Sequence, residues 1–316
     1  METVLKVAFV GAGSMSREHV RAFRDIPGVR LAGVCSRTRG RAEALAAEFG
    51  IPVVADSIPE LHAKTGAALV VVSVPELAAN AVLKACFQCD WVVLAEKPAG
   101  YDPADAEDIA AEAARKGRRA YVALNRRHYS STRQASDRLV TDPGPRFIRI
   151  QDQQDQAAAL AAGQPRQVVE NWMYANSIHV VDYFAVFGRG SIVDVNPVIR
   201  WDPSNPGTVV AHLRFSSGDQ GLYEGTWNGP GPWAVTVSTP AQRLEMRPLE
   251  QLGVQKKGER KLEMQPVDQW DVTFKAGFRM QAEYAVAAAL GKPAGLPRLQ
   301  DALDSMGIVS RIFARG

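Results

Sequence analysis

The stretch VLKVAFVGAGSMS, residues 4–16, decides the fold. It begins with an almost unbroken apolar run of strand length and continues into a glycine turn, and residues 17–24 after it have helical spacing. This order of strand, glycine turn and helix is typical of a dinucleotide site. The first glycine lets the chain turn tightly out of the strand. The second lets the backbone approach a pyrophosphate, whose charge then lies at the amino end of the helix.

The glycine turn predicts cofactor-binding residues and departs from the usual pattern at one position. Ser16 stands where a third glycine is expected, but it is small enough to keep the helix close to the strand. An isolated Gly-x-Gly pair would more simply serve an ordinary tight turn, but its place at the end of a buried strand favours the dinucleotide. The cofactor-binding residues predicted here are Gly11, Gly13, Ser14 and Met15.

The end of the second predicted strand, residues 29–35, bears on the choice of cofactor. In an NAD-preferring site this strand ends in Asp or Glu, which binds the ribose hydroxyls, but here the sequence continues Ser36-Arg37-Thr38 without a carboxylate. Hydroxyl donors and a guanidinium suit a 2′-phosphate. The sequence therefore favours NADP(H) and leaves NAD(H) open. The alternative is that the arginines at 37, 39 and 41 simply form a solvated helix start.

Strands and helices alternate through residue 124, which predicts an N-terminal Rossmann domain over residues 1–124 with a doubly wound parallel sheet. Further buried strands are predicted at residues 67–74, 91–95 and 119–124. Because the carboxyl ends of such strands line the cofactor crevice, Ser73 and Pro75 are predicted to contact the cofactor.

The pattern changes after residue 124, and residues 125–316 are predicted to form a C-terminal α+β domain built on an open, mainly antiparallel sheet. A helix is predicted at 174–187, and residues 253–260 are expected to be a mobile loop. Closing helices are predicted at 271–290 and 299–315. Strands are predicted at residues 147–151, 191–201, 208–216, 220–227, 233–238 and 243–247.

Composition narrows the class of protein. The 316 residues are 46% apolar and 22% charged, with a formal net charge of +3, which is too small to indicate nucleic acid. No apolar run approaches the roughly 18 residues of a membrane span, and no secretory signal is visible, so the expected location is the cytoplasm. The pair Cys86 and Cys89 has neither a second pair nor a nearby histidine. No metal site is predicted.

Four motifs in order resemble the Gfo/Idh/MocA oxidoreductase family over essentially the whole chain. They are the glycine turn with Met15, the sequence Glu96-Lys97-Pro98 after a buried strand, Asn125-Arg126-Arg127 after the next strand, and a histidine in a helix of the second domain. The resemblance implies that the Rossmann domain binds NAD(P) and that a sugar, nucleotide sugar or cyclitol lies between the nicotinamide and the second domain. It also implies a homo-oligomer formed through the C-terminal sheet.

The resemblance also implies the catalytic residues. Lys97 matches the family's active-site lysine, which would hydrogen-bond the substrate oxygen that changes between alcohol and carbonyl; the alternative is a surface lysine paired with Glu96. His179 matches the histidine of the family's Asp-x-x-x-His motif, but Ala175 replaces the carboxylate. Another residue near His179 would then have to assist it, and the candidates are Tyr174, Asn176, Asp182 and Tyr183. Ala79 stands where the family has a second histidine.

The resulting hypothesis is hydride transfer between NADP and a hydroxyl or keto group, with His179 exchanging the proton and Lys97 stabilising the oxygen. Glu96 and Lys97 are added to the cofactor-binding residues. The alternatives are a sugar-modifying enzyme that retains its cofactor without net oxidation and a non-catalytic NADP(H)-binding regulatory protein. His19, His62, His128 and His212 are expected at the surface or in packing. Substrate contacts are predicted for Lys97, Asn125, Arg126, Trp172, Tyr174, Asn176 and His179, although Trp172 and Tyr174 are equally compatible with the core.

Overall fold

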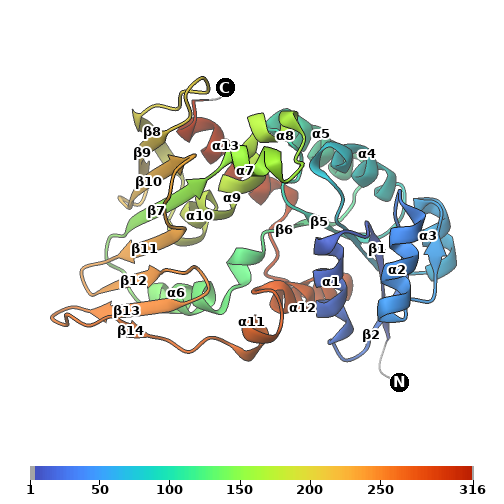
Figure 1. Ribbon diagram of the computed structural model, residues 1–316. Coiled ribbons are helices and arrows are strands. Elements are labelled where there is room, and N and C mark those ends of the chain that lie inside the picture. Colours follow the sequence, from blue (N-terminus) through green and yellow to red (C-terminus); the bar gives the residue numbers. More distant parts are fainter. Residues whose placement is uncertain (1–3, 315–316) are drawn as a thin grey trace. The chain divides into compact units, whose positions relative to one another are not determined.

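The structure is a computed structural model that describes residues 4–314, shown in Figure 1. The chain forms two compact units, Met1–Asn125 with Trp270–Leu303, and Arg126–Gln269 with Asp304–Gly316. The predicted boundary at residue 124 assigned everything after it to a second domain. In the structure the chain returns to the first unit because helix α12 (Phe278–Ala289) buries Phe278 and Ala282 in the core formed with helix α1 (Ser14–Arg24).

The first unit contains the predicted parallel sheet. Every paired strand in it is parallel, and β1 and β4 are neighbours, which is where the strand order reverses. Helices α2 (Arg39–Phe49), α3 (Ile58–Thr65), α4 (Glu76–Cys86) and α5 (Pro103–Arg115) connect these strands. In sheet order the strands are β3 (Val54–Ala55), β2 (Val29–Cys35), β1 (Leu5–Val10), β4 (Leu69–Val72), β5 (Val92–Glu96) and β6 (Ala120–Ala123).

Both faces of this sheet are covered, which explains why its strands are apolar along their whole length. One core cluster joins Phe9 and Phe23 to Phe278, and the other gathers Phe87 and Trp91 on the opposite face. The three cysteines are free thiols within this packing. Burial raises the pKa of the Cys86 thiol, as expected for a packing residue rather than a reactive one.

The second unit contains an eight-stranded sheet that is mainly antiparallel, as predicted; one pair, β7 with β10, is parallel. In β10 buried positions alternate with half-buried ones, so one face is packed and the other faces solvent. In sheet order the strands are β14 (Glu263–Met264), β13 (Leu252–Lys256), β12 (Gln242–Met246), β11 (Ala234–Ser238), β7 (Phe147–Gln154), β10 (Gln220–Trp227), β9 (Thr208–Phe215) and β8 (Ile192–Ile199).

The edge strand β8 exposes Val193, Val198 and Ile199. Such a patch is compatible with pairing of the sheet with a second copy, and the homo-oligomer stays a prediction. Helices η1 (Asn125–His128), α6 (Ser130–Val140), α7 (Gln156–Ala161), α8 (Arg166–Glu170) and α13 (Leu299–Ile312) complete the described chain. No helix among residues 4–314 is long and apolar enough to cross a membrane.

Three predicted segments differ from the structure. The expected mobile loop at 253–260 is wrong in its first part, because strand β13 pairs with β12 and β14 and buries Val254. The predicted helix at 271–290 is interrupted, since α11 (Gln269–Thr273) ends before Gly277, whose φ is +76°. The helix at 174–187 is present but begins as a π-helix, η2 (Met173–Ser177), before α9 (Ile178–Val181) and α10 (Tyr183–Phe187). Residue 315 of the last predicted helix lies outside the described residues.

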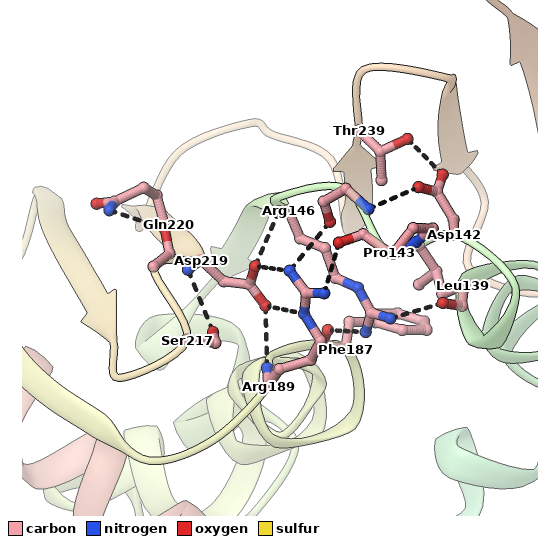
Figure 2. A network of polar contacts seen from close by, with 12 residues as sticks. Leu139, Asp142, Pro143, Arg146, Phe187, Arg189, Ser217, Asp219, Gln220 and Thr239 are labelled. Carbon is pink, nitrogen blue, oxygen red and sulfur yellow. Dashed lines mark hydrogen bonds and ion pairs between the residues drawn. The ribbon is translucent and has the colours of Figure 1, made fainter.

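An ion pair between the buried Asp219 and the partly exposed Arg189 lies at one end of the second sheet (Figure 2). The Asp219 carboxylate is fully buried and accepts from Arg189 Nη2 at 2.6 Å and Nε at 3.0 Å. The backbone N–H groups of Arg146 and Arg189 also donate to it, at 2.9 and 3.1 Å. Burial would raise the pKa of Asp219, but the Arg189 guanidinium and the two backbone donors outweigh burial and lower it. The carboxylate therefore stays charged.

Candidate functional site

A pocket of about 630 Å³ lies in the first unit at the carboxyl ends of β1, β2 and β4. This is the place where an open parallel sheet binds ligands. The pocket gathers seven of the predicted cofactor residues, namely Gly11, Gly13, Ser36, Arg37, Thr38, Ser73 and Pro75. Ser14 and Met15 begin helix α1 directly after the glycine turn, and Glu96 lies at the end of β5. These three residues and Lys97 are not among those that line the pocket.

The glycine turn has the geometry that a dinucleotide requires. Gly11 has a φ of +112°, and a Cβ there would lie 2.0 Å from the carbonyl oxygen of Ser73, so no larger residue fits. A Cβ at Gly13 would meet no described atom within 4 Å, which leaves the space in front of this residue open for a pyrophosphate. The residues present therefore fit a dinucleotide.

Ser16 takes the place of the third glycine and adds hydrogen bonds that a glycine could not form. Its side chain is buried, and its Oγ accepts from the N–H of Gly13 at 3.2 Å. The same oxygen lies 2.5 Å from Ser73 Oγ at the end of β4. The serine thus keeps the helix close to the sheet, as expected, and also fixes the turn to the neighbouring strand.

The arginines after β2 differ in their partners. Arg39 donates to Glu43 at 2.8 Å and also pairs with Asp56, and these hydrogen bonds raise its pKa. Its charge is therefore balanced by protein carboxylates. Arg37 and Arg41 also line the pocket, and no ion pair joins either side chain to another of the described residues. These two guanidinium groups remain available to a ligand phosphate, with the hydroxyls of Ser36 and Thr38 beside them.

Glu96 and Lys97 form the second part of the site in this unit. The Lys97–Pro98 peptide bond is cis. One carboxylate oxygen of Glu96 accepts from the Lys97 N–H at 3.2 Å, and the other lies 2.7 Å from His19 Nε2. His19 is 1% exposed and packs against Phe278, which is one of the two places expected for it, and in addition it is the hydrogen-bond partner of Glu96. Its position three residues after Ser16, on the same face of α1, was the sequence signal for its burial.

His62, His128 and Asn125 are described by their contacts or burial within the protein. His62 lies on the surface with its Nε2 2.7 Å from Asp90 Oδ1. Burial lowers the pKa of His128 to about 3, so this ring is neutral. His212 belongs to strand β9. Asn125, predicted to contact substrate, is buried, and its amide donates to the carbonyl of Ala276 at 3.0 Å. Its amide nitrogen therefore binds the segment 274–277 that connects α11 to α12.

The second unit has its own pocket of about 400 Å³, which contains two predicted substrate residues, Trp172 and Asn176. Trp233 also lines it and was missed, because a tryptophan after a Gly-Pro loop carries no functional signal in the sequence. Arg126 and His179 do not line this pocket but contact Trp233: the guanidinium carbon lies 4.8 Å from the Trp233 ring centroid, and the imidazole centroid 6.2 Å. The remaining lining residues are Gln153, Gln154, Asp155, Ala158, Ala159 and Gly231.

A chain of hydrogen bonds fixes the amides of this pocket. Gln154 Nε2 donates to the buried Asp152 carboxyl at 2.6 Å, which turns the Gln154 oxygen toward Asn176. Asn176 Nδ2 donates to that oxygen at 2.8 Å. Tyr223 donates to the other Asp152 oxygen at 2.8 Å. Burial raises the pKa of Asp152 despite these donors. The Asn176 carbonyl oxygen is thereby left as the acceptor that this side chain can offer a ligand.

Several polar residues near His179 form hydrogen bonds with other side chains of the second unit. Asp182 accepts two hydrogen bonds from Arg127, both at 2.7 Å, and one from Ser305 at 2.6 Å. The Tyr183 hydroxyl lies 3.1 Å from Thr132 Oγ1, and the Tyr174 hydroxyl lies 3.0 Å from Ser310 Oγ. Tyr174 is thus a core residue rather than part of the pocket wall. The π-helix directly before His179 alters the four-residue spacing expected of a regular α-helix, and such segments occur often at functional sites.

The parallel sheet, the glycine turn and the pocket define the first unit as a nucleotide-binding Rossmann domain. Residues 5–124 match the family described as "Oxidoreductase family, NAD-binding Rossmann fold", GFO_IDH_MocA. The first unit is thus similar to this family over residues 5–124, in line with the resemblance that its motifs indicated. Among residues 4–314, no group of histidine, cysteine and carboxylate side chains could hold a metal ion.

Two characterised relatives share part of the sequence. A 4-carboxy-2-hydroxymuconate-6-semialdehyde dehydrogenase from Sphingobium is 26% identical over 198 residues, which cover 61% of this chain and 62% of the relative. An inositol 2-dehydrogenase from Saccharopolyspora erythraea is 37% identical over 117 residues, 36% of this chain and 35% of the relative. The matches span less than two thirds of either relative.

The fold extends over the whole chain. A dehydrogenase from Chromobacterium violaceum superposes with a TM-score of 0.84 at 18% identity and covers 98% of this chain and 94% of its own. At this identity the similarity shows the fold alone.

Proposed function

We propose that this protein is an NADP-dependent dehydrogenase or reductase that transfers a hydride between the nicotinamide and a hydroxyl or keto group of a sugar, nucleotide sugar or cyclitol. The observation that carries the proposal is the open pocket at the glycine turn, with Lys97 at the carboxyl end of β5 in the same sheet. The bound cofactor would supply or accept the hydride. The turn residues and the amino end of α1 would hold its pyrophosphate.

The chain's own residues have two chemical tasks. The Lys97 ammonium would donate a hydrogen bond to the substrate oxygen and stabilise the negative charge that develops on it. His179 would take the proton from the substrate hydroxyl in oxidation and return it in reduction. Ala175 stands where the resemblance implies a carboxylate, and Asn176 beside it lines the pocket of the second unit.

The pocket of the second unit supports a neutral hydroxylated substrate. It offers amide oxygens, two indole rings and the carboxylate of Asp155, and none of the described residues that line it is Lys, Arg or His. Amide groups hydrogen-bond hydroxyls, and indoles pack on the apolar faces of sugar rings. This composition favours a polyol like the one named for the inositol 2-dehydrogenase over the carboxylated substrate of the Sphingobium relative.

Screening for turnover tests this function. The protein would be incubated with NADP⁺ and myo-inositol, D-glucose or UDP-glucose, and with NADPH and the keto compounds formed by oxidation of one hydroxyl group of each. We expect a change in nicotinamide absorbance with at least one neutral hydroxylated compound. Binding of NADPH without turnover of any of them would favour a non-catalytic protein.

We expect Arg37→Ala to raise the Kd for NADPH by about 10- to 100-fold, because a hydrogen bond to a charged group contributes about 1.5–3 kcal/mol. The Kd for NADH should change little, since NADH lacks the 2′-phosphate that Arg37 is proposed to bind. Both values would be measured from nicotinamide fluorescence. Arg39→Ala is the matched control, because Glu43 and Asp56 already balance its charge. Equal effects of Arg37→Ala on both cofactors would contradict the phosphate role.

A further inference from the structure

We propose that His19 is a positioning residue that acts through Glu96 to hold Lys97, and that it thereby links the helix of the glycine turn to the lysine of the site. This inference rests on the proposed function only for the chemical role of Lys97. The arrangement itself lies entirely within the first unit and joins helix α1, strand β5 and the turn after that strand.

The geometry gives each carboxylate oxygen of Glu96 a defined donor. Oε1 lies 2.7 Å from His19 Nε2, and Oε2 accepts from the Lys97 N–H at 3.2 Å. The imidazole is itself fixed, since its ring centroid lies 4.7 Å from that of Phe278 on α12. The Glu96 side chain therefore bridges α1 and the backbone of Lys97, and its conformation depends on His19.

The charge state of Glu96 determines the direction of these hydrogen bonds. Burial would raise the pKa of its carboxyl, but the hydrogen bond from His19 and the charges of His19 and Lys97 outweigh burial and lower it. An ionised carboxylate only accepts, so His19 Nε2 must be the donor. His19 Nδ1 has no hydrogen-bond partner among the described residues, so the bond to Glu96 is the one side-chain hydrogen bond described for this ring.

Stability alone does not explain a buried pair of this kind. A buried ionic or strongly polar pair often contributes no more than well-packed apolar residues of the same volume, and a leucine would fill the space beside Phe278. The pair instead fixes one conformation at Lys97. Removing the imidazole would leave Oε1 of the largely buried Glu96 carboxylate without its donor, which raises the pKa of that carboxyl and favours its neutral form.

The test compares His19→Leu with His19→Gln, whose amide can still donate to Glu96. The reactivity of Lys97 toward acetic anhydride would be measured by mass spectrometry against Lys84 of the same protein. In His19→Leu we expect Lys97 to react about threefold faster or more than in the wild type, because a neutral Glu96 no longer favours the charged ammonium. In His19→Gln the rate should stay at the wild-type value.

A double mutant shows whether His19 acts through Glu96. Glu96→Gln should have the same effect on Lys97 as His19→Leu, and adding His19→Leu to Glu96→Gln should change the rate no further. If His19→Leu fails to fold, Glu96→Gln and His19→Gln still carry the comparison. An unchanged Lys97 rate in His19→Leu or in Glu96→Gln, or failure of His19→Gln to restore it, would overturn the proposal. Failure of the proposed function would be seen separately, as loss of NADPH binding or turnover in the wild type.

Discussion

Lys97→Met is expected to lower kcat by about a hundred- to ten-thousand-fold, the usual contribution of a group that stabilises or transfers charge in the transition state. The Kd for NADPH should change by less than about threefold, because Lys97 does not line the cofactor pocket. Steady-state kinetics with the best compound of the screen, together with NADPH fluorescence, would measure both quantities.

Lys84→Met is the control for this experiment, since Lys84 is a surface residue paired with Asp108 in the same unit. It should retain wild-type kcat. Full activity in Lys97→Met would remove the lysine from the mechanism, and loss of NADPH binding in that variant would show that Lys97 serves the cofactor instead.

Arg189→Ala is expected to lower the free energy of unfolding by about 3–5 kcal/mol, because it leaves the buried Asp219 carboxylate without its guanidinium (Figure 2). Urea unfolding would measure the loss. The control is Arg214→Ala, whose pair with Asp194 is exposed on both sides and should contribute about 0–1 kcal/mol. A loss for Arg189→Ala no larger than the control's would contradict the role of this ion pair.

The pH dependence of stability gives this prediction a second observable. Because folding lowers the pKa of Asp219, its contribution is fully present above the unfolded pKa, about 3.9, and is lost as pH falls through the folded pKa. Without Arg189 the folded pKa rises, so acid unfolding should begin at a higher pH in Arg189→Ala than in the wild type.

The sequence predicted those elements whose residues carry a local physical signature. Strand β1 and the glycine turn were predictable because a buried parallel strand is apolar along its whole length and Gly11 requires a positive φ. Strand β13 was not, since it lies near the edge of its sheet and ends in polar residues that resemble a loop. The sequence also did not predict that residues 270–303 belong to the first unit, because the pattern of an amphipathic helix does not indicate which sheet the helix covers.

In the site, too, the sequence predicted the residues that belong to a local motif. The pocket gathers seven residues that two local motifs and the end of β4 had indicated. The pairing of His19 with Glu96 was missed because the two residues lie 77 positions apart, and a polar pair of that separation leaves no local pattern. Asn125 was predicted from a motif, and Tyr174 from its place at the start of the predicted helix at 174–187. Their hydrogen bonds to Ala276 and Ser310 could not be read from the sequence, and their substrate contacts stay predictions.

The central claim is that this chain transfers a hydride to or from a neutral hydroxylated substrate with NADP. Its most direct test is the nicotinamide absorbance of wild-type protein and of Lys97→Met, each mixed with NADP⁺ and myo-inositol, D-glucose or UDP-glucose. We predict steady reduction of NADP⁺ by the wild type with at least one of these compounds, and a rate at least a hundredfold lower for Lys97→Met. No reduction by the wild type in either direction of the screen, with NADPH binding intact, would contradict the claim.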